Sequence, residues 1–530
     1  MSGTRNDPTD VLVVGGGPAG LTAAHELARR GLRVRVVDQA AAPAVTSRAT
    51  ATHARTLETY HQMGVLDEIL ARGHRVANFS MHLRGRRLIR FGTDYSELPT
   101  RFPFTLQIDQ VLTEQVLRDK LATHGVAVEW SVTLAGFEDT GAEVVAKLRH
   151  ADGREETCRV PWLVGADGAH STVRKRLGLR LLGDSTEKWL IADAHLDVDL
   201  PRDSLHWMHT GRGTILLVPF PEPGKWRLLD TADATTSDEP EVVRARLQQK
   251  ISFALRRKVQ VAEPTWISVF TIQQRMIEQM RVGRCFVVGD AAHVHSPASG
   301  QGMNTCVQDA VNLGWKLADV LRGNAAEELL DSYEAERVPV GQLLLGSTKT
   351  ATALIALRNV LAPVLLPIGL GVLNRLTPAK KRAERKILRG MSGLAQNYAA
   401  SPLTAPGPAP SAGGFAPGDR VGCSAETAQA SAGWTALCEG LTDPRWTLLA
   451  FGAADEDELI RVEKHYGGAV AVRRAGGADL PDPGDALARS FGLAGGGFAL
   501  IRPDGYLAAS TTSTASPEDL LTGAHLLARA

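Results

Sequence analysis

The 530-residue chain contains few cysteines, and their spacing excludes the usual roles of clustered cysteine. The five cysteines stand far apart and no two form a C-x-x-C pair, so neither a zinc site nor a dithiol redox centre is expected. Such sparse cysteine fits a cytoplasmic protein kept in a reducing compartment. A chain of this length can bury a large core without disulfides or metals, and it should form several domains.

The chain also lacks an excess of charge and a membrane-length apolar run. The 59 Lys and Arg residues balance 58 Asp and Glu residues, so no electrostatic attraction to nucleic acid is expected. The N-terminus is polar and contains no apolar core of signal-peptide type. One uncharged segment, residues 359–374, is shorter than the roughly 20 residues of a spanning helix and is broken by Pro363 and Pro367. We expect a buried connector or a subunit contact there, and no membrane partner.

The first forty residues predict a strand, a glycine-rich turn, a helix and a second strand. Val11–Val14 is a continuous apolar strand, and the second apolar strand ends at Asp38. Such a βαβ unit begins a parallel sheet that is buried on both faces. The turn reads Gly15-x-Gly17-x-x-Gly20, in which the glycines allow a tight turn, a close approach of a pyrophosphate, and close packing of helix on strand. An acid at position 38 favours an unphosphorylated ribose, and therefore FAD or NAD over NADP.

Other patterns divide the rest of the chain. Alternating and paired apolar runs between about residues 188 and 272 predict an antiparallel sheet, with a hairpin that turns at residues 221–224. A helical pattern runs from Gly302 to about Leu321, and Ala325 to roughly Leu394 continues mainly helical. Residues 401–418 are rich in Pro, Gly, Ala and Ser and predict a linker. Beyond them, residues 446–451 predict a strand and residues 497–508 a hairpin that turns at Pro503-Asp504-Gly505.

Two histidines lie close together in the segment GDAAHVHSPASGQGMN, residues 289–304. His293 and His295 would suit a metal ion, but no third or fourth ligand stands nearby, so no metal site is expected. A helix that begins at Gly302 presents unpaired N–H groups and a partial positive charge. Gly300 and Gly302 allow backbone to lie against a flat ring, where a Cβ would clash. The segment is therefore interpreted as a backbone cradle for a ligand.

Three motifs in this order resemble a known family: GGGPAG at residues 15–20, LVGADGAHSTVRK at residues 163–175, and GDAAHVHSPASGQGMNTCVQDAVNLGWKLADVL at residues 289–321. Together they are similar to the single-component (class A) FAD-dependent aromatic hydroxylases, typified by para-hydroxybenzoate hydroxylase. The long form, with an RPDGY-like hairpin, most resembles phenol hydroxylase and the polyketide-tailoring and rifampicin-type monooxygenases.

The resemblance implies an α/β fold in four parts. They are a Rossmann-like FAD-binding domain that includes a helical connector, an interleaved antiparallel-sheet substrate domain, a linker, and a thioredoxin-like C-terminal domain without C-x-x-C. Because Cys423 and Cys438 stand far apart in the sequence, we expect a structural or oligomeric role for the last domain and no redox chemistry. The predicted boundaries are 1–187 with 273–400 for the FAD-binding domain, 188–272 with contributions from about 74–106 for the substrate domain, 401–418 for the linker, and 419–530 for the C-terminal domain.

The resemblance also assigns residues to FAD. Asp38 would hold the adenosine ribose, with Gln39 beside it, and Arg48 would lie along the cofactor. Gln107, in LQIDQVLTEQVL, would touch the ribityl chain.

Asp167 and Gly168 match an Asp-Gly motif linked in the family to both the FAD pyrophosphate and the nicotinamide cofactor. The family commonly continues with Ala-Arg-Ser, whereas this chain has Ala169-His170-Ser171, which replaces a permanent cation by a titratable one.

The third motif would meet the flavin itself. Asp290 would bind the ribityl hydroxyls, Pro297 would pack beside the reactive edge, and Gly302, Met303 and Asn304 would meet the pyrimidine end. A helix N-terminus aimed there stabilises negative charge without a titrating side chain. The full predicted cofactor-binding set is Gly15, Gly17, Pro18, Ala19, Gly20, Asp38, Gln39, Arg48, Gln107, Asp167, Gly168, Asp290, Pro297, Gly300, Gly302, Met303 and Asn304.

The reaction that the resemblance implies is insertion of one oxygen atom from O₂ into a phenolic or polycyclic, polyketide-like aromatic, by way of a flavin hydroperoxide and with NADPH or NADH as electron donor. Baeyer–Villiger oxygenation of a ketone, a flavin dehydrogenase or reductase, and a flavin-binding sensor without turnover stay open as alternatives. The residues identify no catalytic base. His53, near Arg48, is a weak candidate, and a structural or surface role is favoured for it as for His206 and His209, which flank Trp207. The expected partners are a small aromatic molecule and O₂, and the expected assembly is a monomer or homodimer.

Overall fold

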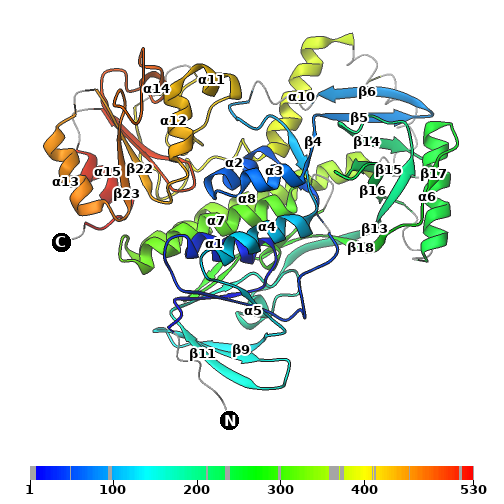
Figure 1. The fold of residues 1–530 in the computed structure, drawn as a ribbon, viewed down its shortest axis with the longest axis horizontal. Coiled ribbons are helices and arrows are strands. Elements are labelled where there is room, and N and C mark those ends of the chain that lie inside the picture. Colours follow the sequence, from blue (N-terminus) through cyan, green and yellow to red (C-terminus); the bar gives the residue numbers. More distant parts are fainter. Residues whose placement is uncertain are drawn as a thin grey trace.

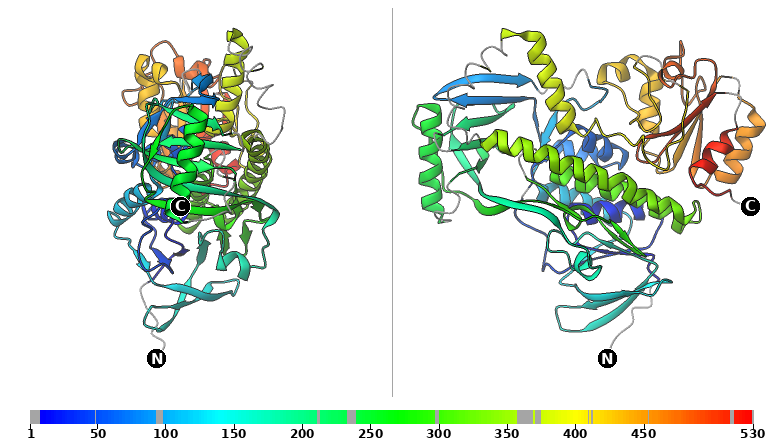
Figure 2. Two further views of the ribbon diagram at one scale, coloured as in Figure 1. Left: turned by 90° about the vertical axis from the view of Figure 1, so that its right-hand side faces the viewer. Right: turned by 180° about the vertical axis from the view of Figure 1, so that it is seen from behind.

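The fold is described on a computed structural model, which covers residues 8–47, 49–92, 98–210, 213–232, 239–296, 300–356, 369, 375–408, 410, 413–452, 454–512 and 516–528. Five sheets with their helices form three parts (Figure 1). The large antiparallel sheet lies toward one end of the long helices α7 (Gly302–Leu321) and α8 (Asp331–Ala356), and the C-terminal domain lies toward the other end (Figures 1 and 2).

A six-stranded sheet forms the centre of the first part, in the order β19-β20-β12-β1-β2-β8. β1 runs parallel to both β2 and β12, and all four of its residues are buried, as the continuous apolar run predicts. The strands are β1 (Val11–Val14), β2 (Val34–Asp38), β8 (Val128–Trp130), β12 (Trp162–Gly165), β19 (Arg281–Val282) and β20 (Cys285–Val287). The predicted βαβ start of a parallel sheet is confirmed.

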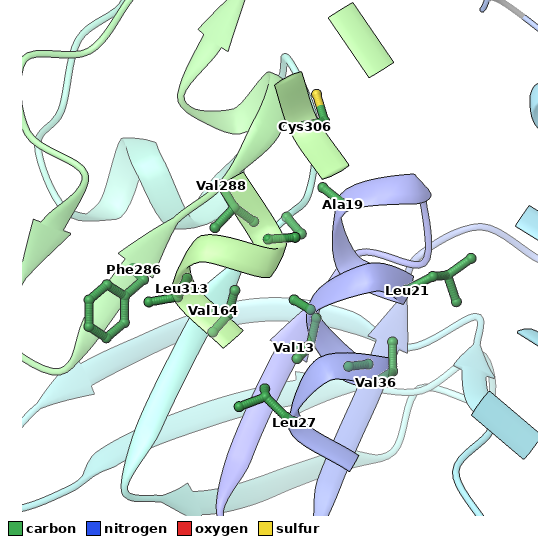
Figure 3. Packing of buried hydrophobic residues seen from close by; sticks show 14 of the residues in the cluster. Val13, Ala19, Leu21, Leu27, Val36, Val164, Phe286, Val288, Cys306 and Leu313 are labelled. Carbon is green, nitrogen blue, oxygen red and sulfur yellow. The ribbon is translucent and has the colours of Figure 1, made fainter. Parts of the chain in front are cut away.

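Three helices pack together beside this sheet: α1 (Pro18–Ala28), α4 (Gln110–Ala122) and α7 (Gly302–Leu321). Their apolar side chains join those of the strands in one core, shown from close by in Figure 3, where Ala19 of α1 and Cys306 of α7 lie near Val288. An antiparallel sheet of β9 (Thr133–Asp139), β10 (Val144–Arg149) and β11 (Glu155–Val160) contributes to the same core.

The second part is a nine-stranded sheet, mostly antiparallel, with helix α6 (Pro240–Leu255) packed on one face. The hairpin predicted around residues 221–224 is confirmed, because β15 and β16 pair antiparallel on either side of it. β5 and β6 come from earlier in the chain, and β5 pairs parallel with β14. The strands are β5 (Asn78–Leu83), β6 (Arg86–Gly92), β13 (Leu182–Asp197), β14 (Ser204–His209), β15 (Thr214–Pro219), β16 (Lys225–Asp230), β17 (Gln260–Val261), β18 (Trp266–Met276) and β21 (His293–Val294).

Helices α8 (Asp331–Ala356) and α10 (Thr377–Ser392) form the connector. Apart from residue 369, the uncharged segment 359–374 lies outside the described residues. Within the described ranges, no helix combines the length and the apolar character that a membrane crossing requires.

The C-terminal domain has a four-stranded sheet in the order β23-β22-β24-β25. β22 (Trp446–Phe451), α13 (Glu456–Tyr466) and β23 (Val470–Arg474) form a parallel unit, and the hairpin of β24 (Gly497–Ile501) and β25 (Leu507–Thr512) follows. The predicted strand and hairpin are confirmed, while the assignment of the domain as thioredoxin-like stays a prediction. The remaining helices are α11 (Ala425–Ala430), α12 (Ala432–Gly440), α14 (Ala486–Ser490) and α15 (Pro517–Gly523).

A buried charge cluster joins the C-terminal domain to the first part. Arg502 donates to Glu336 of α8 at 2.7 and 2.8 Å, and Lys316 of α7 contacts the same carboxylate at 2.8 Å. The hydroxyl of Ser401, at the start of the predicted linker, donates to Glu336 at 2.6 Å. Burial lowers the pKa of Lys316 to about 8 although Glu336 opposes this shift. These contacts hold the C-terminal domain in a defined position.

Candidate active site

The glycines of the β1–α1 turn serve different purposes. Gly15 has φ +113°, and a Cβ there would lie 2.3 Å from the Ala166 carbonyl oxygen, while a Cβ on Gly20 would lie 1.9 Å from that of Gly15. A Cβ on Gly17 would meet nothing within 4 Å. Helix α1 begins there without a side-chain hydrogen bond, with Pro18 in its first turn. Gly15 and Gly20 are therefore required by packing, and the open helix start at Gly17 leaves N–H groups for an anion.

Asp38 lies beside this turn, at the end of β2. Its carboxylate accepts from the Gly16 N–H at 2.6 Å and from the Ala40 N–H at 2.7 Å. Gln39, next to it, is exposed, and Arg48 lies outside the described residues. Each carboxylate oxygen can accept a second hydrogen bond, so Asp38 can hold the glycine turn and ribose hydroxyls together.

Asp167 follows β12 and accepts hydrogen bonds at the start of α5 (Thr172–Arg176), from the Thr172 N–H at 2.6 Å and the Ser171 hydroxyl at 2.5 Å. Gly168 has φ +73°. The motif also holds a residue that sequence reasoning missed. The buried guanidinium of Arg174 donates to the Ala291 carbonyl at 3.0 Å and so joins the second motif to the third.

The third motif begins where α1, the loop and α7 meet. Gly289 has φ +62°, and a Cβ there would lie 3.0 Å from the Cβ of Ala19 and 3.1 Å from that of Cys306. The next residue, Asp290, is exposed, and its carboxylate accepts from the Cys306 thiol at 3.5 Å. Pro297 lies outside the described residues. Close packing at Gly289 fixes the position from which Asp290 extends.

The start of α7 is held by one side chain. The amide of Asn304 donates to the Ala51 carbonyl at 2.9 Å and to the Gly300 carbonyl at 2.8 Å, and its oxygen accepts from the His53 N–H at 2.8 Å. The helix has no side-chain cap, and a Cβ on Gly302 would meet nothing within 4 Å. The N–H groups of the first turn are thus left for a ligand.

Gln107 and His53 lie next to this helix start. β3 (Ala51–Thr52) pairs antiparallel with β7 (Thr105–Gln107), which places Gln107 opposite Ala51. Among the described residues, the buried Oε1 of Gln107 has no hydrogen-bond partner, and such an atom calls for a ligand donor. His53 is 2% exposed, and its Nδ1 lies 3.3 Å from the Thr105 hydroxyl. His53 as a catalytic base stays a prediction.

These features fit FAD. One uncapped helix start with a free Cβ position lies at Gly17, and a second lies at Gly302. Asp290, which follows Gly289 beside Ala19 and Cys306, is exposed, and Gln107, opposite Ala51, offers a buried acceptor without a partner among the described residues. A pyrophosphate suits the first helix start, hydroxyls suit these two polar groups, and an electron-rich ring suits the second helix start.

The two histidines of the third motif belong to a buried chain of polar groups that sequence reasoning missed. His295 contacts His293 at 2.8 Å, and His293 contacts Asp309 of α7 at 2.5 Å. Asp309 accepts from Arg337 of α8 at 2.6 Å, and Arg337 donates to the Tyr398 hydroxyl at 2.9 Å. Among the described residues, no group of three or more His, Cys, Asp or Glu side chains is placed to hold a metal ion.

Asp309 is the charged centre of this chain. Burial opposes its ionisation, but Arg337 and His293 outweigh burial and lower its pKa to about 2. Burial and the neighbouring His293 lower the pKa of His295 well below its usual value, so His295 is neutral at pH 7. The histidines therefore fasten the loop to α7 and α8.

Comparisons with known proteins agree with this site. A family profile described as FAD binding domain matches residues 8–348. The chain is 56% identical to 6-methylpretetramide 4-monooxygenase of Streptomyces rimosus over 537 residues, which cover 98% of this chain and 96% of that protein. The structure of the flavin-dependent monooxygenase PieE, in complex with FAD and substrate, is similar with a TM-score of 0.81 at 25% identity, covering 98% of this chain and 99% of that one.

A second structure, that of the anhydrotetracycline hydroxylase OxyS from Streptomyces rimosus, is similar with a TM-score of 0.75 at 28% identity, covering 98% of this chain and 99% of that one. Both structures match the chain through its C-terminal domain. The family profile, the near full-length relative and the cradle between Gly17 and Gly302 lead to one conclusion. The chain belongs to the family of FAD-dependent aromatic monooxygenases, which use NAD(P)H as electron donor.

Proposed function

We propose that the protein hydroxylates a phenolic ring of a polycyclic, polyketide-like substrate. The near full-length relative is named for oxygenation of 6-methylpretetramide, and OxyS is named for hydroxylation of anhydrotetracycline. The proposal includes action in the cytoplasm as a monomer or homodimer, with the aromatic molecule and O₂ as partners and without nucleic acid or a membrane. The balanced charge and the sparse cysteines of the chain support this part.

The observation that carries the proposal is an aromatic face on the nine-stranded sheet. Aromatic residues are only 5% of the chain, yet three of its nine tryptophans, Trp189, Trp207 and Trp266, lie on this face, while Trp226 packs on the α6 side of the sheet. Register pairs Trp189 with Phe270 and Asp193 with Trp266, so these side chains share the face opposite α6. Trp189 and Trp207 are buried, whereas Phe79, Trp266 and Phe270 are half-buried. Flat, partly exposed rings suit a flat multi-ring ligand.

An ion pair supports the view that this face is turned toward the cofactor. Arg227 and Asp193 lie on it and form a two-pronged ion pair with both distances 2.8 Å, almost fully buried. Arg227 also donates to the Ser47 carbonyl at 2.8 Å, in the segment that follows β2 and Asp38. A substrate on the aromatic face would therefore lie against the FAD-binding part.

FAD, held at the helix starts of Gly17 and Gly302, would supply the redox chemistry by which electrons from NAD(P)H activate O₂. The protein binds and orients the reactants. The helix starts at Gly17 and Gly302 direct N–H groups at negative charge, and Gln107 and Asp290 accept from hydroxyls. The aromatic rings of the sheet face exclude water from the reacting ring.

The test uses purified protein with FAD, NADPH and a panel of polycyclic phenols that includes 6-methylpretetramide. We expect phenol-dependent NADPH oxidation and a product that carries one oxygen atom from labelled O₂ with every ring intact. A product with an expanded lactone ring would establish Baeyer–Villiger chemistry instead. NADPH oxidation without labelled product for any phenol would refute the proposal.

Two variants of β18 locate the substrate. Phe270→Ala removes a ring from the aromatic face and should raise the KM for the phenol about ten-fold or more, from the 1.5–3 kcal/mol that a buried aromatic side chain contributes. Val269→Ala is the matched control, because Val269 pairs with Leu190 of the α6 core and so lies on the other face. FAD affinity should not change in either variant. Equal KM values for the two variants would place the substrate elsewhere.

A further inference from the structure

Two of the five cysteines meet in the C-terminal domain. Cys423 precedes α11 and Cys438 lies in α12, and their sulfur atoms are 3.9 Å apart. Because the two cysteines are 15 positions apart in the sequence, no redox chemistry was expected of them. Helices α11 and α12 fold the intervening chain back on itself, which brings the two thiols into contact. In the part of the chain that the structure describes, this is the one hydrogen-bonded pair of thiols.

The surroundings of the pair differentiate the two thiols. The hydrogen bond between the two sulfurs, together with the nearby Arg101 guanidinium, lowers the pKa of the Cys423 thiol although burial opposes the shift. The same hydrogen bond and burial raise the pKa of Cys438. Arg101 is held in place by Glu439, the neighbour of Cys438, at 2.8 Å. The Cys423 thiol therefore loses its proton more readily than the Cys438 thiol, although both are buried.

We propose that Cys423 and Cys438 are a modification site at which hydrogen peroxide forms a reversible intrachain disulfide. The Cys423 thiolate attacks one oxygen of the peroxide, the O–O bond breaks, and a sulfenic acid forms as hydroxide leaves and is protonated to water. The Cys438 sulfur, after losing its proton, attacks the sulfenic sulfur, and a second hydroxide leaves as water. Two thiols are oxidised and one peroxide is reduced to two waters. A dithiol reductant reverses the change by exchange.

The position of the pair indicates what oxidation would move. A disulfide has an S–S length of about 2.05 Å, so the two sulfurs must approach each other from 3.9 Å. Both ends of this loop hold the FAD-binding part. Arg420, before Cys423, binds Glu58 of α2 (Ala54–Gln62) at 2.9 Å, and Glu439 binds Arg101. Oxidation therefore acts on the contact between the two domains.

The chain offers a direct test, because residues 421–445 contain both cysteines and no Lys or Arg before Arg445. Trypsin therefore releases both thiols in a single peptide. The FAD-loaded protein is treated with peroxide, quenched, unfolded and alkylated, and the peptide is weighed. We expect a peptide that is lighter by two hydrogen atoms and carries no alkyl group, and dithiothreitol should restore double alkylation.

Controls distinguish the pair from general thiol oxidation. Cys158→Ser should leave formation of the cross-linked peptide unchanged, whereas Cys423→Ser should abolish it. Arg101→Gln should shift the rate of cross-linking to higher pH, because the cation that favours the Cys423 thiolate is gone. A wild-type peptide that stays doubly alkylated, or that gains oxygen atoms without a cross-link, would overturn the proposal. The wild-type peptide decides even if a variant fails to fold.

Discussion

Replacing Asn304 by alanine should weaken both the fold and FAD binding. The variant loses three hydrogen bonds of 2.8 to 2.9 Å: one joins the start of α7 to β3, one joins it to the start of α2, and one holds the Gly300 carbonyl of the preceding loop. Asn304 is 3% exposed, so water cannot replace these partners without entering the core. At about 1 kcal/mol for each neutral hydrogen bond, the free energy of unfolding should fall by about 3 kcal/mol.

The assay is urea unfolding of the protein without and with saturating FAD. Unfolding of the apoprotein measures the loss of fold stability, and the extra stability that FAD provides measures its affinity. Both should fall in Asn304→Ala, because the helix start that faces the cofactor is no longer fixed to its neighbours.

Asn397→Ala is the control. Asn397 is an exposed asparagine whose amide donates to Asp419 at 2.5 Å, and its removal should change the free energy of unfolding by less than about 1 kcal/mol. If Asn304→Ala and Asn397→Ala lose equal stability and both keep full FAD affinity, the role assigned to Asn304 is wrong.

Two further predictions concern the glycine turn and acid stability. Gly20→Ala should lose up to about 3 kcal/mol of stability, since its Cβ would lie 1.9 Å from a carbonyl oxygen. Gly17→Ala should keep apoprotein stability and lower FAD affinity about ten-fold. Calorimetry with FAD checks both variants, and normal FAD binding by Gly17→Ala would contradict the site. The buried Asp309 has its pKa lowered from 3.8 to about 2, so its ionisation contributes about 2 kcal/mol above pH 4, and this contribution is lost as the pH falls toward 2. Urea midpoints from pH 7 to pH 2 should show that part of the acid dependence missing in Asp309→Asn and present in the surface control Asp331→Asn.

The strands and helices that depend on neighbouring residues were predictable from the sequence. Val11–Val14, Gly302–Leu321 and Trp446–Phe451 have the bounds that were expected, because buried apolar runs and helical periodicity act over neighbouring residues. The positive φ at Gly15 and the tight packing of Gly20 also follow from a short motif with a known geometry.

Contacts between distant segments were not predictable in this way. Asp309 gave no local sign that it would bind His293, and Arg174 gave none that it would reach Ala291, 117 residues away. Cys423 and Cys438 show the same limit at short range, because two helices between them reverse the chain. Sequence periodicity shows which face of a helix is buried, but the partner of a polar group depends on how the elements pack.

The cluster around Glu336 has a consequence for how the protein is made. Arg502 follows Glu336 by 166 residues, which at about 5–20 residues per second corresponds to roughly 8–30 s of synthesis. During that interval, the nascent FAD-binding part has Lys316 as the only cation, among the described residues, that pairs with this buried carboxylate. The first domain to leave the ribosome is therefore completed by the last. We expect chains that stop before Arg502 to be recognised by chaperones as unfinished, although every predicted FAD-binding residue has already been made.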